Sequence, residues 1–399
     1  MKYKYVAVTD TGFKVTGSVE ANSEADVVNM LRGNQYFPIS VERDISAEAG
    51  IELFAPKVTK KDLAVFCKQF YTMLDAGLSI VRCLDVLAAQ TENKTLKKAI
   101  SSLADNVQKG MTLSEAMALQ PKVFPKILVN MVEAGEVSGD LDAILEKMAV
   151  HFEKENKIES KVKSSTVYPI ALLVVTICVV VFMIVFVLPT FISMFEGSGT
   201  ELPGATQLLI NLSNSMRSKW YVYLGVVAAV VLGVKAFTSS ERGRRTFDFI
   251  KLKLPVISTT TVKVVTSRFT RTLSTLISSG IPLLRSMEVV SKVVDNSVVE
   301  QRIKDSIEDI RRGIPLSRAV KEVGLFPPMV DSMIRIGEES GALDDILLKT
   351  ADFYDEEVEV ALTRMTTLIE PIMIVFMALI IGFIVIAMYM PMFEVITTI

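Results

Sequence analysis

The sequence has few residues of the types on which catalysis and metal binding usually depend. Among 399 residues it has one histidine, one tryptophan and three cysteines. The cysteines, Cys67, Cys83 and Cys178, form no C-x-x-C pair, which argues against a disulfide framework and for soluble parts in a reducing compartment. We expect each to be a small buried apolar residue. His151 lies in a charged helical segment, where we expect a solvated surface residue rather than a catalytic base or a metal ligand.

Other signatures of enzymes and nucleic-acid binders are also missing. No G-x-x-x-x-G-K-[ST] loop occurs, so the sequence has no Walker-type nucleotide site. The 43 basic residues nearly balance the 45 acidic ones, which argues against a nucleic-acid partner. The first residues lack the apolar run of a secretory signal, so none is expected. We therefore expect no catalytic, cofactor-binding or metal-ligating residues, and a protein that is not itself an enzyme.

Long uncharged runs predict an integral membrane protein. Half of the residues are hydrophobic and the mean hydropathy is +0.41. The run from Pro169 to Pro189 covers about 31 Å as a helix, which matches the hydrocarbon thickness of a bilayer. A second run extends from Pro371 to Phe393. A third, 220–234, is shorter; its clustered Trp and Tyr residues favour a span, and a helix buried in a soluble core is the alternative.

The distribution of basic residues predicts the orientation of these spans. Lysines precede the first span, few basic residues lie between spans one and two, and several follow the second span. Because basic residues gather on the cytoplasmic side, we expect the amino terminus and 236–370 inside, with 196–219 and the tail outside. No charged residue lies within any of these three runs, which argues against an ion-coupled transporter, although transporters do use internal repeats.

The sequence repeats itself at a shift of 203 residues, which becomes 202 after one deletion. Phe66 then falls on Phe269, and Pro169 falls on Pro371. The G-E-x-S-G-x-L motif occurs once in each copy, as Gly135, Glu136, Ser138, Gly139 and Leu141, and as Gly337, Glu338, Ser340, Gly341 and Leu343. The repeat therefore includes both a soluble domain and a membrane span.

Hydrophobic periodicity gives the fold class. Apolar stripes at helical spacing predict about six helices in each repeat, and alternating residues predict strands before the repeats. We expect a mainly α protein with two homologous six-helix-bundle cytoplasmic domains, three transmembrane helices and a small N-terminal ββαβ module. The predicted segments are a module at 1–45, a linker at 46–58, bundles at 59–165 and 239–368, spans at 166–195, 219–238 and 369–393, an external loop at 196–218 and an external tail at 394–399.

The repeated motif has two interpretations. It could be a tight turn between helices, with the glycines giving backbone freedom and Ser138 or Asp140 capping the next helix. Alternatively, Glu136 and Glu338 present their carboxylates to a partner or a divalent cation. Glu370, beside Pro371, is interpreted in the same two ways, because a carboxylate at a helix start is stabilised by the helix dipole.

Together these residues resemble the PilC/GspF family, the inner-membrane platform proteins of type IV pilus and type II secretion machines. The resemblance covers nearly the whole chain and rests on the doubled motif, on the Glu370-Pro371 entry to the last span and on the order of spans. It implies a platform for type IV pilus assembly that couples a cytoplasmic assembly or retraction ATPase to insertion or extraction of pilin. A type II secretion or competence platform is the alternative, and a transporter with internal repeats is a remote one.

The resemblance also implies partners. They are a cytoplasmic hexameric assembly ATPase, pilin or pseudopilin subunits, other inner-membrane alignment proteins and the lipid bilayer, with the chain as a homodimer or homotrimer. The charged helix at 304–312 is one candidate for ATPase contact, and an ordinary solvated face is the alternative. The sequence leaves the type of machine and the stoichiometry open.

Overall fold

The computed structural model describes residues 2–9, 14–20, 24–33, 36–43, 56–193, 203–255 and 257–397. The chain divides into two compact units, residues 1–57 and 58–399. Each unit is described by itself below.

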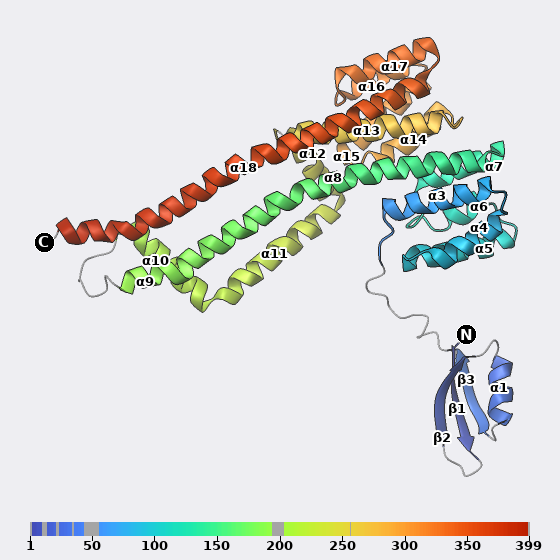
Figure 1. Cartoon of the computed structure of the whole chain (residues 1–399), viewed down its shortest axis with the longest axis horizontal. Helices are drawn as coiled ribbons and strands as arrows, with labels where there is room; N and C mark the ends of the chain where they lie inside the picture. The colour runs from blue at the N-terminus through green and yellow to red at the C-terminus, as the bar shows by residue number, and fades with distance from the viewer. Residues whose placement is uncertain are drawn as a thin grey trace. The chain divides into compact units, whose positions relative to one another are not determined.

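The first unit contains a small antiparallel sheet with one helix. Its elements are β1 (Lys2–Thr9), β2 (Lys14–Glu20), α1 (Glu24–Gly33) and β3 (Tyr36–Arg43). The strand order is β2-β1-β3, and α1 packs on the sheet by burying Val27 and Leu31 against Ala7 (Figure 1).

The second unit begins with the helices of the first repeat. They are α3 (Lys60–Asp75), α4 (Ile80–Gln90), α5 (Lys94–Gln108), α6 (Leu113–Ala118), α7 (Lys126–Ser138) and α8 (Leu141–Phe182). Thr59 is the N-cap of α3 and forms a capping box with Asp62, so the helix begins where the sequence indicates.

The helices of the second repeat follow in the same order. They are α13 (Ile257–Ile277), α14 (Leu283–Val293), α15 (Ser297–Arg311), α16 (Leu316–Val323), α17 (Pro328–Ser340) and α18 (Leu343–Thr397). One continuous hydrophobic core joins the two repeats, with Phe70 and Phe124 from the first, and Phe269 and Leu273 from the second. The repeats therefore share one core within this unit.

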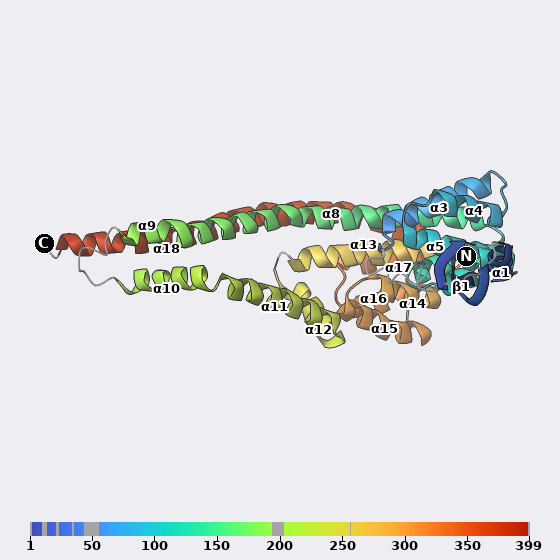
Figure 2. The same ribbon diagram turned by 90° about the horizontal axis from the view of Figure 1, so that it is seen from below.

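Two very long helices connect the repeats to the apolar segments. α8 continues through Pro169 into a π-helical turn (η1, Met183–Val187) and α9 (Leu188–Ser193). α18 is unbroken over 55 residues. The domain boundaries predicted at 165 and 368 therefore do not coincide with helix ends, because the soluble and apolar parts belong to the same helices. The two helices lie side by side in both views (Figures 1 and 2).

Within the part of the chain that the structure describes, three helices are long and apolar enough to cross a membrane, as predicted. Besides α8 and α18 the third is α11 (Trp220–Ser239), in which no residue is buried. The alternative of a helix buried in a soluble core is therefore wrong for α11. Cys67 and Cys83 are buried as expected, but Cys178 is exposed on the apolar part of α8, so its predicted burial is wrong.

The segment expected as an external loop contains a helix, α10 (Gly204–Ser218). The Thr206 hydroxyl donates to the carbonyl of Ala387 at 2.5 Å, and the Ser213 hydroxyl donates to the carbonyl of Ile184 at 2.7 Å. Ile184 lies in the π-helical turn, where the irregular ladder leaves carbonyls available for such partners. These two hydrogen bonds hold α10 against the C-terminal part of α18 and against the π-helical turn that follows α8.

Candidate functional site

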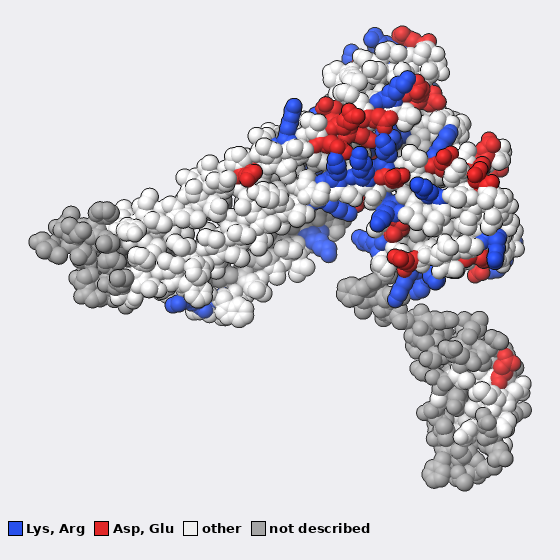
Figure 3. Space-filling model, viewed as in Figure 1, with Lys and Arg blue, Asp and Glu red and all other residues white. Residues whose placement is uncertain are grey.

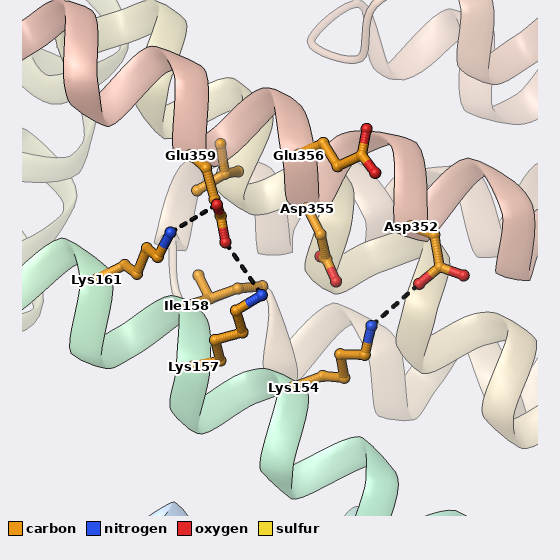
Figure 4. Close-up of a pocket in the computed structure, with 9 residues that line it drawn as sticks. Lys154, Lys157, Ile158, Lys161, Asp352, Asp355, Glu356 and Glu359 are labelled. Atoms are coloured by element: carbon orange, nitrogen blue, oxygen red, sulfur yellow. Dashed lines mark hydrogen bonds and ion pairs between the residues drawn. The ribbon is translucent and has the colours of Figure 1, made fainter.

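Opposite charges gather where α8 and α18 meet, next to their apolar segments. We call residues 151–161 of α8 and 352–359 of α18 the neck. Figure 3 shows that Lys, Arg, Asp and Glu are dense here and that the adjoining surface of the long helices is nearly free of charge. The lysines Lys154, Lys157 and Lys161 lie on α8, and the carboxylates Asp352, Asp355, Glu356 and Glu359 lie on α18 (Figure 4).

The surface of the neck is a set of ion pairs around a cavity of about 470 Å³. Lys157 Nζ lies 3.2 Å from Glu359 Oε1, and Lys161 Nζ lies 2.6 Å from Glu359 Oε2. Lys154 Nζ lies 3.4 Å from Asp352 Oδ1. These side chains are exposed by 39% or more, so each pair contributes little to stability by itself. Together they fix the register of the two helices.

Beneath the surface pairs lies a buried ionic network centred on Glu155, which is 2% exposed. Lys60 of α3 donates to its Oε2, and Nε of Arg268 of α13 lies 3.7 Å from its Oε1. Burial opposes ionisation of Glu155, but Arg268 and Lys60 outweigh burial and hold its pKa below the usual range. The network therefore joins a helix of the second repeat to two helices of the first.

Arg271, one turn further along α13, binds the other long helix. Its Nη2 donates to Asp352 Oδ1 at 2.8 Å and to Asp355 Oδ2 at 2.6 Å. Ser267 donates its hydroxyl to Asp355 at 2.5 Å. Burial raises the pKa of Asp352, but Arg271 and Lys154 lower it more, so the net pKa lies below the usual range. α13 is thus held to α8 by Arg268 and to α18 by Arg271.

His151 lies inside this network rather than on the surface, so the prediction of a solvated residue is wrong. It is 3% exposed, and burial lowers its pKa to about 4 against the opposing effect of Glu155. Its Nδ1 has no hydrogen-bond partner among the described residues. The charged sequence around His151 is misleading because α8 packs against both α3 and α13, which bury one face of a highly charged helix.

Part of the network follows the internal duplication. Lys60 and Lys263 occupy the same position in the two repeats, as do Glu155 and Glu357, and Lys263 Nζ lies 2.5 Å from Glu357 Oε2. Applying the repeat register to the charged residues could have revealed these pairs. His151, Arg268 and Arg271 fall on Phe353, Val65 and Lys68, so the repeat gave no signal for them.

The two copies of the G-E-x-S-G-x-L motif have the same local geometry. Glu136 accepts from the backbone N–H groups of Leu113 and Ser114, at 2.5 and 3.1 Å, and from the Ser114 hydroxyl. Glu338 makes the same three contacts with Leu316 and Ser317. Each carboxylate therefore caps the N-terminus of the short helix α6 or α16, where it satisfies otherwise unpaired donors.

The glycines of the motif serve two different needs. Gly139 and Gly341 end α7 and α17 with φ of 84° and 71°, a conformation that favours glycine. Gly135 packs directly against the next helix, since a Cβ there would lie 3.1 Å from the Cα of Leu141. At Gly337 the corresponding distance, to the Cα of Leu343, is 2.9 Å.

The motif serines contact only the turn itself. The Ser138 hydroxyl donates to the carbonyl of Gly135 and accepts from the backbone N–H of Asp140, at 3.4 and 3.3 Å. Ser340 donates to Gly337 in the same way. Asp140 is the N-cap residue of α8 but makes no side-chain capping bond. The prediction that Ser138 or Asp140 caps this helix through its side chain is therefore wrong.

Glu370 and Pro371 lie in the middle of α18, not at a helix start, so the prediction based on the helix dipole is wrong. The Glu370 carboxylate instead accepts from the Tyr168 hydroxyl of α8 at 3.2 Å. Tyr168 and Glu370 occupy the same position in the two repeats. Among the described residues, no group of His, Cys, Asp and Glu side chains is arranged to hold a metal ion.

This geometry defines a class of membrane protein in which one structural unit occurs twice. Each unit is a set of short helices continuous with a candidate span. Comparison with family models names the class. The type II secretion system (T2SS) protein F model matches residues 66–189 and again 269–391, and the model of its N-terminal domain matches residues 1–42. The chain belongs to this family, the PilC/GspF family.

Relatives in two kinds of machine are similar over nearly the whole chain. The type IV pilus assembly protein PilC of Myxococcus xanthus is 38% identical over 98% of this chain and 94% of its own length. PilC of Thermus thermophilus is 36% identical, over 99% of this chain and 98% of its own length. The type II secretion system protein F of Aeromonas hydrophila is 32% identical, over 94% of this chain and 98% of its own length.

Proposed function

We propose that this protein is the inner-membrane platform of a type IV pilus assembly machine. It couples a cytoplasmic hexameric ATPase to the insertion of pilin subunits into a filament, or to their extraction. The observation that carries the proposal is the parallel pairing of α8 and α18, whose charged parts bind α13 and whose apolar parts form two of the three candidate spans. The similarity to relatives named type IV pilus assembly proteins supports it.

The proposed architecture has two homologous six-helix bundles in the cytoplasm and a ββαβ module before them. From the Lys157–Glu359 pair to the Tyr168–Glu370 pair, the residue number increases equally on α8 and α18, so the two helices run in the same direction. The N-terminal ends of two parallel spans lie on the same face of the membrane. Because each bundle precedes its span in the chain, this arrangement supports placing both bundles in one compartment. The basic residues after α11 support the cytoplasmic side, with the connecting segment and the C-terminus outside.

The neck gives such a platform its stiffness. A displacement applied to the second bundle reaches α13, and Arg268 and Arg271 carry it to both long helices. Because each long helix has no break between its bundle and its apolar segment, the displacement continues into the membrane. ATP hydrolysis belongs to the partner, and the chain transmits motion.

The repeated motif has a structural role in this proposal. Glu136 and Glu338 are engaged by backbone donors, which makes a direct contact with a partner or a divalent cation unnecessary. We place the ATPase contact on the bundle surfaces, with α15 as the candidate element. Its Lys304 and Arg311 pair with Glu300 and Glu308 of the same helix, so an ordinary solvated face is the competing assignment.

The remaining partners are proposed from the family. They are pilin subunits that contact the spans, other inner-membrane alignment proteins, and a second or third copy of the chain. A charge-reversed Lys304→Glu/Arg311→Glu chain should capture less ATPase from a co-expression lysate than the unaltered chain. The matched control is Lys97→Glu in α5, the equivalent helix of the first repeat.

Deletion of the gene tests the main proposal. Surface filaments should disappear while pilin accumulates in the membrane, and a plasmid copy should restore filaments. Restoration should fail with Arg271→Ala and succeed with Lys157→Ala, because the first side chain is buried in the network and the second is exposed. Intact filaments after deletion would contradict the proposal.

The second candidate is the platform of a type II secretion machine. The family model carries that name, and the protein F relatives support it. The same deletion separates the two functions. Loss of an exported enzyme from the medium with filaments intact would assign the chain to secretion, and loss of solute uptake alone would assign it to transport.

A further inference from the structure

The helix that follows the second span carries an apolar stripe and a set of basic residues. This helix, α12 (Glu241–Lys253), begins directly after α11, with Ser240 as its N-cap. Phe247 and Ile250, with Leu254 at the C-cap, are spaced on one helical face and are exposed by 45%, 44% and 44%. We call these three residues the stripe. An exposed apolar face on a basic helix requires an explanation.

The contact between α12 and α11 shows which way the stripe faces. Gly243 lies on the stripe face, one turn before Phe247. A Cβ at Gly243 would lie 1.8 Å from the backbone oxygen of Phe237, which lies in the last turns of α11. This face of α12 is therefore turned toward the end of the span, whose own residues are all outside the protein core.

The opposite face of α12 is fixed to the second repeat. Asp248 is buried and accepts from the backbone N–H and the hydroxyl of Ser297, at 3.0 and 2.9 Å. Arg244 and Lys251 lie beside the same carboxylate. These bonds set the rotation of α12 about its axis, so the stripe cannot turn inward to join the core.

Basic side chains flank the stripe. On one side Lys251 Nζ lies 4.7 Å above the ring of Phe247. On the other side lie Arg242 and Lys253, which take no part in the ion pairs of Asp248 and are exposed. Apolar residues flanked by exposed basic ones are typical of a helix lying in the interface of an anionic membrane.

We propose that α12 is an interfacial anchor that inserts the stripe into the bilayer leaflet at the end of α11 and binds anionic lipid headgroups through Arg242 and Lys253. The occupant of the surface is the membrane that α11 crosses, because the stripe continues the lipid-facing surface of that span. The proposal does not depend on the pilus function. It needs only that α11 spans the bilayer.

Tryptophan quenching by brominated lipids in vesicles tests this proposal on the full chain. Trp220 is the only tryptophan and lies at the other end of α11. A Trp220→Phe/Phe247→Trp chain places the single reporter in the stripe, and the unaltered chain reports from Trp220. Each is reconstituted into phosphatidylcholine vesicles containing phosphatidylglycerol, with bromine on one lipid or on the other at constant composition.

We expect strong quenching at Phe247→Trp. The share of quenching caused by brominated phosphatidylglycerol should exceed the share of this lipid in the vesicles. R242Q and K253Q together should abolish that preference, because each basic residue at an anionic surface changes the local lipid ratio roughly five-fold at most. The unaltered chain controls for preference along the rest of α11. A Trp220→Phe/Leu119→Trp chain places the reporter on an exposed bundle site and should show no lipid quenching.

Two results would overturn the proposal. If Phe247→Trp is quenched as little as Leu119→Trp and is accessible to aqueous iodide, the stripe lies outside the bilayer and is free for a protein partner. If both brominated lipids quench it in proportion to their amounts, and the double variant behaves identically, the headgroup recognition is wrong.

Discussion

Lys157 and Glu359 occupy the same position in the two repeats, and their side chains form an ion pair with 3.2 Å between Nζ and Oε1. Equivalent positions also meet at Tyr168 and Glu370. Two parallel helices related by an approximate two-fold axis bring equivalent residues together in this way. Identical charges would repel there, so the two copies have diverged, with lysines on α8 and carboxylates on α18.

Buried and exposed ion pairs of the neck should differ in their contribution to stability. Replacing Lys60 by Met leaves the buried Glu155 with Arg268 alone and should lower the free energy of unfolding by about 3 kcal/mol, at the low end for buried pairs. Lys157→Met, the control in an exposed pair, should cost less than about 1 kcal/mol. Thermal unfolding of the purified chain in detergent, followed by circular dichroism, measures both. Equal effects would show that Glu155 is not held by this network.

His151 should make stability depend on pH. Its pKa is lowered from 6.5 to about 4 in the folded chain, so the unfolded chain binds more protons between these values. The stabilisation is therefore complete above pH 6.5 and decreases as the pH falls toward 4, by about 3 kcal/mol in total. Glu155 and Asp352 have lowered pKa values, so their contributions are lost only at lower pH.

The single histidine makes this prediction easy to isolate. In His151→Leu the decline between pH 6.5 and 4.5 should disappear, whereas Lys157→Met should retain it. Unfolding temperatures measured across this range provide the comparison. A variant without histidine that keeps the full slope would assign the pH dependence to another group.

The motif carboxylates should act as helix caps. Glu136→Ala and Glu338→Ala each leave backbone donors of a short helix unsatisfied, and each should cost about 2 kcal/mol. Amide hydrogen exchange should accelerate in α6 for the first variant and in α16 for the second. Glu339→Ala, an exposed neighbour in the same turn, is the control and should change neither. Unchanged exchange in α6 and α16 would favour a partner-binding role instead.

Gly337 should not tolerate a side chain. A Cβ would lie 2.9 Å from the backbone Cα of Leu343, so Gly337→Ala must separate α17 from α18 and should cost about 1–3 kcal/mol. Gly382, also within α18, has nothing within 4 Å of the corresponding position, and Gly382→Ala should be neutral or slightly stabilising. Similar unfolding temperatures for the two variants would contradict the close contact.

Features that depend on a short stretch of sequence, such as membrane spans and helix starts, could be predicted from the sequence. Uncharged runs predict the candidate spans, and the expected start of the first bundle at residue 59 coincides with the N-cap of α3. The helix start expected at Glu370 is wrong because a proline such as Pro371 usually marks a helix boundary, whereas helices in a membrane accommodate proline.

The candidate site could be predicted only where the repeat guided it. Lys60 and Lys263 repeat in sequence, and so do their carboxylate partners. Arg268 acts across the boundary between repeats by contacting Glu155, and Arg271 contacts Asp352 and Asp355 of its own repeat, more than 80 residues further along the chain. Burial of His151 depends on the same packing, which no periodicity along α8 encodes.

Labelling of single cysteines tests the central claim, that both repeats lie on one side of the membrane and continue into parallel spans. With Cys67, Cys83 and Cys178 replaced by alanine, Lys97→Cys, Lys321→Cys and Lys219→Cys are treated with a membrane-impermeant maleimide. In intact cells only Lys219→Cys should react, and the two bundle positions should react together after the inner membrane is permeabilised. Labelling of Lys97→Cys and Lys321→Cys from opposite sides would contradict the account.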